Sequence, residues 1–253
     1  GGHNASMRDR PAGLGEEQLT AAMREGWGMQ AASVDYLPVG AGSYHWSVVD
    51  DRGVAWFVKV DDLGSAGFDD LRRSYGTASA LHRDAGLGFV VPPIPATDGA
   101  VVRRLTSRYA ITVFPMIDGA AGDFGPHRRE DLAELADLFA ALHRATPAVA
   151  HLAPRTDLRL PGRDRLLEAL HALDRPWTAG PHAEPARALL TRHRARILRR
   201  LADFDTLVDI VRDTPSDWVV THGEPHPGNV LRTAEGLRLI DWTTVQIAPP
   251  ERD

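Results

Sequence analysis

Cysteine is absent from the 253 residues, and this excludes disulfide bonds, thiolate metal sites and a cysteine nucleophile. Long apolar runs are also missing, since stretches such as Leu87–Pro95 are too short to span a membrane. The formal charge is −5 at pH 7 and no basic face is concentrated enough to suggest nucleic acid, so neither nucleic acid nor a membrane is expected as a partner. With 43% hydrophobic and 25% charged residues, the composition is that of an ordinary globular chain.

Lysine is nearly absent as well. Lys59 is the only lysine among the 29 basic residues, and the other 28 are arginine. A GC-rich genome would produce this codon bias, and most surface cations tolerate either residue. A lysine that persists against such a bias is expected where a compact ammonium is needed and a planar guanidinium cannot replace it. Chance is the alternative interpretation.

The ends of the chain carry their own expectations. Residues 1–6 precede Met7 and are predicted to be the remnant of an expression tag, so they do not enter the fold prediction. The residues after Met7 lack the basic-then-apolar pattern of a signal peptide, and the expected compartment is the cytoplasm. The length allows one large domain or two small lobes, and the sequence defines no oligomeric state.

The first part of the chain is predicted to be rich in strands. A tight turn with Gly40 and Gly42 precedes the second strand, and the third strand carries Lys59. Taken alone, the two glycines are typical of an ordinary hairpin. The expected elements are a helix at 14–30, strands at 33–38, 44–49 and 54–60, a helix at 68–84, and strands at 89–91, 100–105 and 109–115.

The later part of the chain is predicted to be mostly helical. Helices are expected at 132–142, 163–173 and 184–203, with short buried strands at 218–221 and 237–240. Four consecutive glycine or alanine residues at 119–122 mark 116–125 as a hinge or linker. The predicted fold class is therefore α+β, with a small β-rich N-lobe at 7–115 and a larger helical C-lobe at 126–253.

A loop dense in histidine, glycine, proline and asparagine carries the strongest motif. Glu224 precedes Asn229 by five residues, and Asp241 follows a short strand twelve residues later. This is the spacing of a kinase catalytic loop and its metal-binding aspartate. Phosphoryl transfer needs a carboxylate to accept the hydroxyl proton, oxygen ligands for Mg²⁺, and a cation such as Lys59 on the nucleotide phosphates. Singly, each of these residues would also suit an ordinary loop.

Two histidines in this loop, His222 and His226, are four residues apart. That spacing suits a zinc site only on a helix, which Pro225, Pro227 and Gly228 prevent. We expect both histidines to hold the loop through hydrogen bonds.

These segments together resemble the aminoglycoside phosphotransferase family, small-molecule kinases that share the two-lobed protein-kinase-like fold. Within that family the sequence is most similar to the spectinomycin phosphotransferase-like branch. The resemblance covers about 33–253, and members of the family usually continue with further helices. The segments that carry it are 39–43, 57–60, 222–229, 239–242 and 248–253.

The resemblance implies the roles of individual residues. Glu224 is at the catalytic-base position, and Asn229 and Asp241 would be catalytic residues that hold Mg²⁺. The nucleotide would be ATP, although the sequence does not exclude GTP. Its predicted binding residues are Gly40, Gly42 and Ser43 over the phosphates, Lys59 on the α/β-phosphates, and the hinge residues Phe114, Met116 and Ile117 around adenine. Because Pro115 has no N–H, the hinge donor is expected from Met116 or Ile117.

The resemblance also implies a function: transfer of the γ-phosphoryl of ATP to a hydroxyl of a cationic small molecule, such as an aminoglycoside or related antibiotic, with antibiotic resistance as the result. The same fold hosts kinases of choline and homoserine, so a metabolic alcohol is an alternative acceptor. Another alternative is a pseudokinase-like nucleotide-binding protein with little transfer activity.

Three features depart from the family pattern and motivate that last alternative. One is that family members usually continue with further helices where this sequence ends. Glu224 stands where the family usually has aspartate, and its extra methylene moves the carboxylate by about one bond length. Kinases pair the strand lysine with a glutamate of the following helix, yet 74–76 offers no acid. The expected partners of Lys59 are therefore Asp70 or Asp69, or else Asp241 or the nucleotide.

Overall fold

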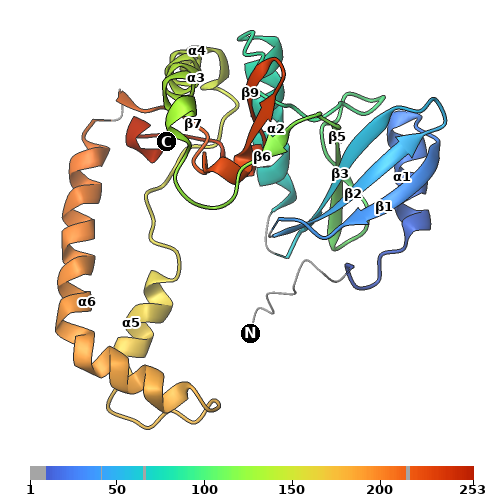
Figure 1. Cartoon of the computed structure of the whole chain (residues 1–253). Helices are drawn as coiled ribbons and strands as arrows, with labels where there is room; N and C mark the ends of the chain where they lie inside the picture. The colour runs from blue at the N-terminus through green and yellow to red at the C-terminus, as the bar shows by residue number, and fades with distance from the viewer. Residues whose placement is uncertain (1–9, 41, 65–66, 215–216) are drawn as a thin grey trace. The chain divides into compact units, whose positions relative to one another are not determined.

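The computed structural model describes residues 10–40, 42–64, 67–214 and 217–253. Their elements follow the expected order, with the long strands early and most helices later, and the predicted α+β fold class is confirmed (Figure 1). The chain forms two compact units, Gly1–Arg155 with Val219–Asp253, and Thr156–Trp218. The predicted tag remnant lies outside the described residues.

A five-stranded antiparallel sheet forms the first part of the larger unit, with strand order β1-β2-β3-β5-β4. Lys59 lies on the central strand of this order. The elements are α1 (Glu16–Trp27), β1 (Ala31–Leu37), β2 (Ser43–Asp50), β3 (Ala55–Asp62), α2 (Phe68–Arg83), β4 (Arg103–Arg104) and β5 (Tyr109–Pro115).

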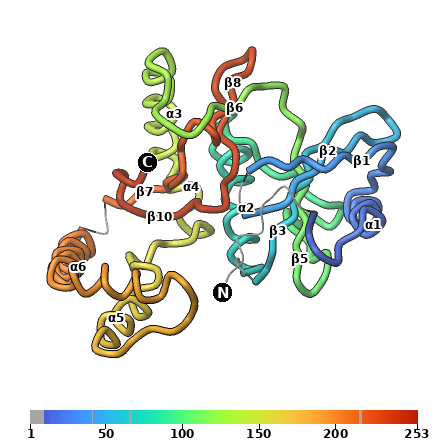
Figure 2. Tube along the Cα trace, turned by 60° about the horizontal axis from the view of Figure 1, so that its bottom comes forward, coloured from blue at the N-terminus to red at the C-terminus, as the bar shows by residue number. Residues whose placement is uncertain are grey.

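The two faces of this sheet are covered by different helices (Figures 1 and 2). The face with Val58 and Val60 packs on α1, which buries Leu19 completely. On the opposite face, Tyr75 of α2 packs against Phe114. Because side chains alternate along a strand, Lys59 lies on the face that α2 covers.

The rest of the larger unit contains two smaller sheets. Strands β6 (Ala120–Ala121), β8 (Val230–Thr233) and β9 (Gly236–Leu239) form one, and β7 (Val219–Thr221) pairs with β10 (Gln246–Ala248) in the other. The helices are α3 (Leu132–Arg144) and α4 (Thr146–Val149), with 3₁₀ turns η1 (Arg129–Asp131), η3 (Pro227–Asn229), η4 (Trp242–Thr244) and η5 (Pro250–Arg252). The loop between β7 and β8 contains the predicted catalytic motif.

The smaller unit consists of α5 (Arg163–His171) and α6 (Ala183–Arg212). The guanidinium of Arg163 donates two hydrogen bonds to the carboxylate of Asp205, at 2.8 and 2.7 Å. Among the residues that the structure describes, no helix combines the length and apolar character needed to cross a membrane.

Several predicted boundaries differ from the observed ones. The expected strand at 89–91 is a single parallel bridge from Val90 to Leu239, because Pro92 and Pro93 follow and cannot donate to a ladder. The strand expected at 100–105 is limited to 103–104. Helix α6 continues to Arg212, since no proline or glycine interrupts it after 203. The linker at 116–125 contains β6, and the lobe boundaries stay a prediction.

Candidate functional site

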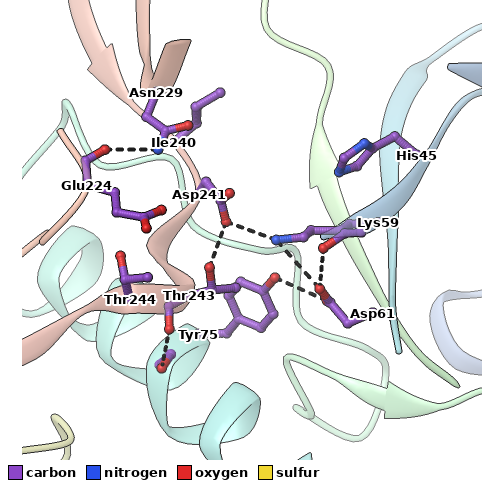
Figure 3. Close-up of polar contacts among 12 residues, drawn as sticks. His45, Lys59, Asp61, Tyr75, Glu224, Asn229, Ile240, Asp241, Thr243 and Thr244 are labelled. Atoms are coloured by element: carbon purple, nitrogen blue, oxygen red, sulfur yellow. Dashed lines mark hydrogen bonds and ion pairs between the residues drawn. The ribbon is translucent and has the colours of Figure 1, made fainter. Parts of the chain in front are cut away.

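A cavity of about 210 Å³ in the larger unit brings distant parts of the sequence together. Five predicted site residues line it: Gly42, Ser43, Lys59, Glu224 and Asp241. The other lining residues are Asp61, Asp70, Leu71 and Thr243. The predicted residues Gly40, Phe114, Met116, Ile117 and Asn229 lie outside this lining. The chemistry-bearing side chains come from β2, β3, the loop before β8, and the residues after β9 (Figure 3).

The Lys59 ammonium lies between two carboxylates. Its Nζ is 2.9 Å from Oδ1 of Asp241 and 3.6 Å from Oδ1 of Asp61, and it lies over the ring of Tyr75 (Figure 3). Burial by itself would lower the pKa of Lys59. The oxygens of Tyr75, Asp61 and Asp241 outweigh burial and raise this pKa well above its ordinary value. The group is therefore a permanent cation.

This geometry decides between the expected partners of Lys59. The prediction that it pairs with Asp241 is confirmed. The alternative partners on α2 were wrong, because both form ion pairs within their own helix: Asp69 with Arg72 and Asp70 with Arg73. Sequence reasoning missed Asp61, although it is two residues from Lys59 on one strand and therefore shares its face.

Asp241 takes a backbone conformation that residues other than glycine rarely adopt, with φ +59° and ψ +66°. Such strain is characteristic of functional sites. Its Oδ1 accepts hydrogen bonds from Lys59 Nζ and Thr243 Oγ1, each at 2.9 Å. Burial would raise the pKa of Asp241, but Lys59 and Thr243 lower it to about 2. The carboxylate is therefore ionised at neutral pH.

Asn229 is buried at the end of η3 and oriented by its own loop. Its Nδ2 donates to the carbonyl of Glu224 at 2.9 Å, and its backbone carbonyl accepts from the N–H of Ile240 at 3.0 Å. Because Nδ2 has this partner, Oδ1 is the atom that Asn229 can offer to a cation. One amide oxygen and the carboxylate of Asp241 are oxygen donors of the kind that Mg²⁺ prefers.

No cluster of three or more histidines and acids suited to a metal occurs in the part of the chain that the structure describes.

The loop histidines hold the backbone, as the sequence predicts. The buried His222 donates from Nε2 to the carbonyl of Ile240 at 2.9 Å, and its Nδ1 accepts from the N–H of Glu224 at 3.3 Å. Burial lowers the pKa of His222, so the ring is neutral. Nδ1 of His226 accepts from the N–H of Gly228 at 3.1 Å. These bonds fix the backbone that presents Glu224.

Asp253 is a second residue that sequence reasoning did not single out. Its side chain is 1% exposed and accepts from the N–H groups of His222 at 3.1 Å and Gly223 at 2.7 Å. It also contacts Nε2 of His143 at 3.0 Å. A separation of 30 residues gives no local pattern that would predict this contact, yet the carboxylate anchors the start of the catalytic loop.

Gly223 is required by the packing beneath the loop. Its φ is +91°, and an added Cβ would lie 2.0 Å from the guanidinium of Arg252. That guanidinium donates to Thr221 Oγ1 at 2.9 Å and to the carbonyl of Thr244 at 2.8 Å. Arg252 thus takes the space that a side chain at 223 would need.

The Glu224 side chain is exposed and lines the cavity. In the described part of the chain, its carboxylate has no hydrogen bond or ion pair. Figure 3 shows it on the side of the site where Asp241 lies. Of the carboxylates lining the cavity, Asp61, Asp70 and Asp241 all have partners, so Glu224 is the one available to accept a proton.

The predicted hinge follows the end of β5. Phe114 is buried against Tyr75 with ring centroids 5.5 Å apart. The N–H of Met116 donates to the carbonyl of Ala55 at 3.4 Å, which continues the pairing of β5 with β3. Among the described residues, the N–H of Ile117 has no such partner.

The glycine turn, defined as Gly40, Gly42 and Ser43, leads into β2. Gly42 has φ +89° and open space around it, which brings its backbone to the cavity without a side chain in the way. An added Cβ at Gly40 would meet the ring of His45 at 3.1 Å. The hydroxyl of Ser43 donates to Asp61 at 2.6 Å.

Comparison with known proteins adds to this geometry. Residues 35–253 match the model of the phosphotransferase enzyme family. Protein StrN of Streptomyces griseus is 30% identical over 185 residues, which are 69% of this chain. The match spans 56% of StrN, so the chain corresponds to about half the length of that relative.

Two solved structures share the fold. Spectinomycin phosphotransferase APH(9)-Ia, crystallised with ADP and spectinomycin, has a TM-score of 0.73 and 17% identity, covering 94% of this chain and 71% of its own. Amicoumacin kinase hAmiN, in complex with AMP-PNP and Ca²⁺, has a TM-score of 0.58 and 12% identity, covering 92% and 65%. The predicted kinase-like fold is thus confirmed.

Proposed function

Because the chain belongs to the phosphotransferase enzyme family, we propose that it transfers the γ-phosphoryl group of ATP to a hydroxyl group of a small molecule. One observation carries the proposal. An unpartnered carboxylate, Glu224, lines the same cavity as a permanent cation, Lys59, and an ionised aspartate in a strained backbone, Asp241. Phosphoryl transfer needs these three groups together.

The nucleotide would lie along the face of the sheet that carries Lys59. Its phosphates would contact the ammonium and the backbone of the glycine turn, and the N–H of Ile117 would read the base. The complexes of APH(9)-Ia with ADP and of hAmiN with AMP-PNP support a nucleotide in this fold. Lys59 would leave Asp241 for the phosphates when the nucleotide binds.

Asn229 and Asp241 would hold Mg²⁺. When bound, the cation supplies charge neutralisation for the phosphate groups. Four carboxylates, those of Asp61, Asp70, Glu224 and Asp241, line the cavity together with one ammonium, that of Lys59. This excess of negative charge supports a divalent cation as a companion of the nucleotide, because phosphates alone would be repelled.

In the transfer step, the acceptor oxygen forms a bond to the γ-phosphorus as the bond from that phosphorus to the β,γ-bridging oxygen breaks. ADP leaves with the electron pair of the broken bond. The proton of the acceptor hydroxyl passes to the Glu224 carboxylate, which has no other partner in the described chain. His222, Asn229 and Asp253 fix the backbone that presents this carboxylate.

We further propose that the acceptor is an aminoglycoside-like or related cationic antibiotic and that its modification confers resistance. The spectinomycin bound to APH(9)-Ia supports this class of acceptor. The surplus of carboxylates around the cavity also favours a substrate that carries amines. A protein of this kind would act in the cytoplasm, where ATP is available.

The test is a coupled assay of ADP release with Mg-ATP. The panel contains spectinomycin, several aminoglycosides, choline and homoserine. Turnover with an antibiotic supports the proposal, and turnover with choline or homoserine alone identifies a metabolic kinase. Nucleotide binding without turnover across the panel would identify a weak or inactive nucleotide-binding protein.

Two variants test whether any observed turnover takes place in this cavity. Lys59→Ala and Asp241→Ala are expected to abolish it while the protein stays folded by circular dichroism. The matched control is Asp137→Asn, which removes an exposed carboxylate on α3. Full activity in either site variant would contradict the assignment.

A further inference from the structure

Asp61 is the most connected buried carboxylate of the cavity, and neither the motif nor the proposed chemistry accounts for it. Its side chain is 6% exposed. Oδ1 accepts from the hydroxyl of Ser43 at 2.6 Å and lies 3.6 Å from Nζ of Lys59. Oδ2 accepts from the phenol of Tyr75 at 3.4 Å (Figure 3). Burying a carboxylate costs folding free energy unless a cation or hydrogen-bond donors compensate it.

The helix that packs over Lys59 offers no acid to it. Kinases take the partner of the strand lysine from this helix. Here Tyr75 occupies that stretch of α2, and Nζ of Lys59 lies 5.9 Å from the centroid of its ring. Burial raises the pKa of Tyr75 well above its ordinary value, so the phenol is neutral and can donate to Asp61. On this side of Lys59 the carboxylate thus comes from strand β3 and not from α2.

We infer that Asp61 is a positioning residue for phosphoryl transfer, holding the ammonium of Lys59 and the hydroxyl of Ser43 together in the place of a helix glutamate. The inference rests on the proposed function. Because Ser43 ends the glycine turn, one carboxylate fixes both elements that would contact the phosphates. Asp61 would stay beside Lys59 when Asp241 binds the divalent cation.

Three groups lie around the ammonium and His45 is the cross-strand neighbour of Lys59, so a test must separate their effects. Asp61, Asp241 and Tyr75 supply oxygen atoms. His45, opposite Lys59 in the pairing of β2 with β3, is neutral because burial and the charge of Lys59 lower its pKa. Asp61→Asn removes one negative charge, keeps the shape, and leaves an oxygen for Ser43.

The first experiment uses the fact that Lys59 is the only lysine. Protein grown with ¹³Cε-lysine gives one side-chain signal. In the wild type we expect one sharp signal with and without Mg-ADP. In Asp61→Asn we expect that signal to shift in the free protein and to broaden or split with Mg-ADP, because the ammonium is no longer fixed.

The matched control is Asp62→Asn. Asp62 is the next residue along β3, points to the other face, and pairs with Arg108 at 2.7 Å. Its variant is expected to keep the wild-type signal. If the two variants give the same signal in the free protein and with Mg-ADP, the inference is wrong.

The second experiment is kinetic. Loss of one charged hydrogen-bond partner is expected to lower kcat about tenfold or more in Asp61→Asn, with the KM for the acceptor unchanged. Asp61→Asn with Tyr75→Glu returns the carboxylate to the helix and is expected to recover part of kcat. A purely structural role for Asp61 predicts no such recovery. Unchanged kcat in a folded Asp61→Asn would overturn the inference.

The two proposals fail in different ways. A wild-type protein that binds no Mg-ADP and turns over no acceptor contradicts the proposed function. The signal of Lys59 in the free protein requires neither ligand. Identical free-state signals in Asp61→Asn and Asp62→Asn would therefore contradict only the positioning role.

Discussion

Glu224 is the residue on which proton transfer depends, because the other three carboxylates of the cavity already have partners. Glu224→Gln keeps the shape of the side chain and removes its ability to accept a proton. General-base catalysis typically contributes about 10²–10⁴-fold, so kcat is expected to fall within that range. Steady-state kinetics with the best acceptor measures this fall, while the affinity for Mg-ADP should stay unchanged. A Gln variant with wild-type kcat would remove Glu224 from the mechanism.

Glu224→Asp asks a different question at the same position. The shorter side chain withdraws the carboxylate by about one bond length, and near-attack geometries tolerate little displacement. If the acceptor hydroxyl lies where the glutamate reaches, kcat falls. A rise in kcat would show instead that the extra methylene is a cost for this acceptor.

The pair of Lys59 and Asp241 predicts a dependence of stability on pH. The pKa of Asp241 is lowered to about 2, below the ordinary value of 3.8. A carboxyl with a lowered pKa contributes stability above its unfolded pKa and loses it as the pH falls through the folded one. Since the side chain of Asp241 is 37% exposed, solvent screening reduces the size of the effect.

The measurement is urea unfolding of wild type and Asp241→Asn between pH 2 and 5. We expect the difference in midpoint to be constant above about pH 4 and to shrink towards pH 2. Asp137→Asn is the control, because this carboxylate on α3 is exposed and forms no ion pair among the described residues. A difference that grows on acidification has the wrong sign for the assigned pair.

Motif spacing was enough to predict Glu224, Asn229 and Asp241 as candidates, since a catalytic loop is a local pattern, and Lys59 was singled out because it is the only lysine. Their convergence could not be derived from the sequence. The contact of Lys59 with Asp241 spans 182 residues and depends on how the sheet meets the catalytic loop. The anchor at Asp253 has the same non-local character. Asp61, by contrast, could have been predicted, because side chains alternate along a strand and Asp61 is two residues from Lys59.

At the scale of elements, the segment 119–127 contacts the catalytic loop through two hydrogen bonds and a ring contact. The N–H of Gly122 donates to the carbonyl of Pro227 at 2.9 Å, and Nε2 of His127 meets the carbonyl of Pro225 at 2.7 Å. Between these contacts, the ring of Phe124 lies on His226 with centroids 4.6 Å apart. The predicted linker therefore also supports the catalytic loop.

Gly122→Ala tests this support. An added Cβ would lie 2.7 Å from Cβ of Pro227, so the loop or the segment must shift. A displacement of about 1 Å near a reacting centre can cost on the order of 10²-fold in rate, and we expect kcat to fall strongly. Binding of Mg-ADP should weaken less, since Lys59 is on another strand. Wild-type kcat would show that the loop does not depend on this contact.

Gly76→Ala is the matched glycine variant and carries its own prediction. Gly76 lies in α2, and an added Cβ meets nothing within 4 Å. Alanine is favoured over glycine in a helix interior by about 0.5–1 kcal/mol, so the free energy of unfolding should rise by that amount. Urea denaturation measures the rise, and kcat should not change. Destabilisation would mean that α2 is packed more tightly at this point than its described surroundings indicate.

Element prediction worked where the apolar pattern was long and failed where pairing was short. The three strands of the first meander and the helices α2 and α3 were found close to their observed bounds. Strands β8 and β10, each of four residues or fewer, were not predicted. The partner of β10 is the distant strand β7, whereas β8 pairs with β9 across a short turn and was missed because it is short. Local propensity is a weak guide for such strands.

At the scale of the whole molecule, every predicted site residue belongs to the larger unit. That unit is built from two stretches of chain, and the cavity is lined from both: Gly42–Leu71 from the first and Glu224–Thr243 from the second. The smaller unit, Thr156–Trp218, lies between these stretches in sequence, and none of its described residues (156–214 and 217–218) lines the cavity. Nucleotide binding and the smaller unit should therefore be separable by experiment.

Amide hydrogen exchange measured with and without Mg-ADP tests whether nucleotide binding affects only the larger unit. A ligand that binds only the folded site stabilises it by about 2.7 kcal/mol at a hundred times its Kd, and exchange slows where opening exposes the site. We expect protection in β2, β3 and the loop from His222 to Thr243, and no change in α5 or α6. Lys59→Ala should lose the protection in the sheet and the loop alike, because both stretches meet at its ammonium. Protection of α6 as strong as that of β3 would place the nucleotide, or its effect, outside the larger unit.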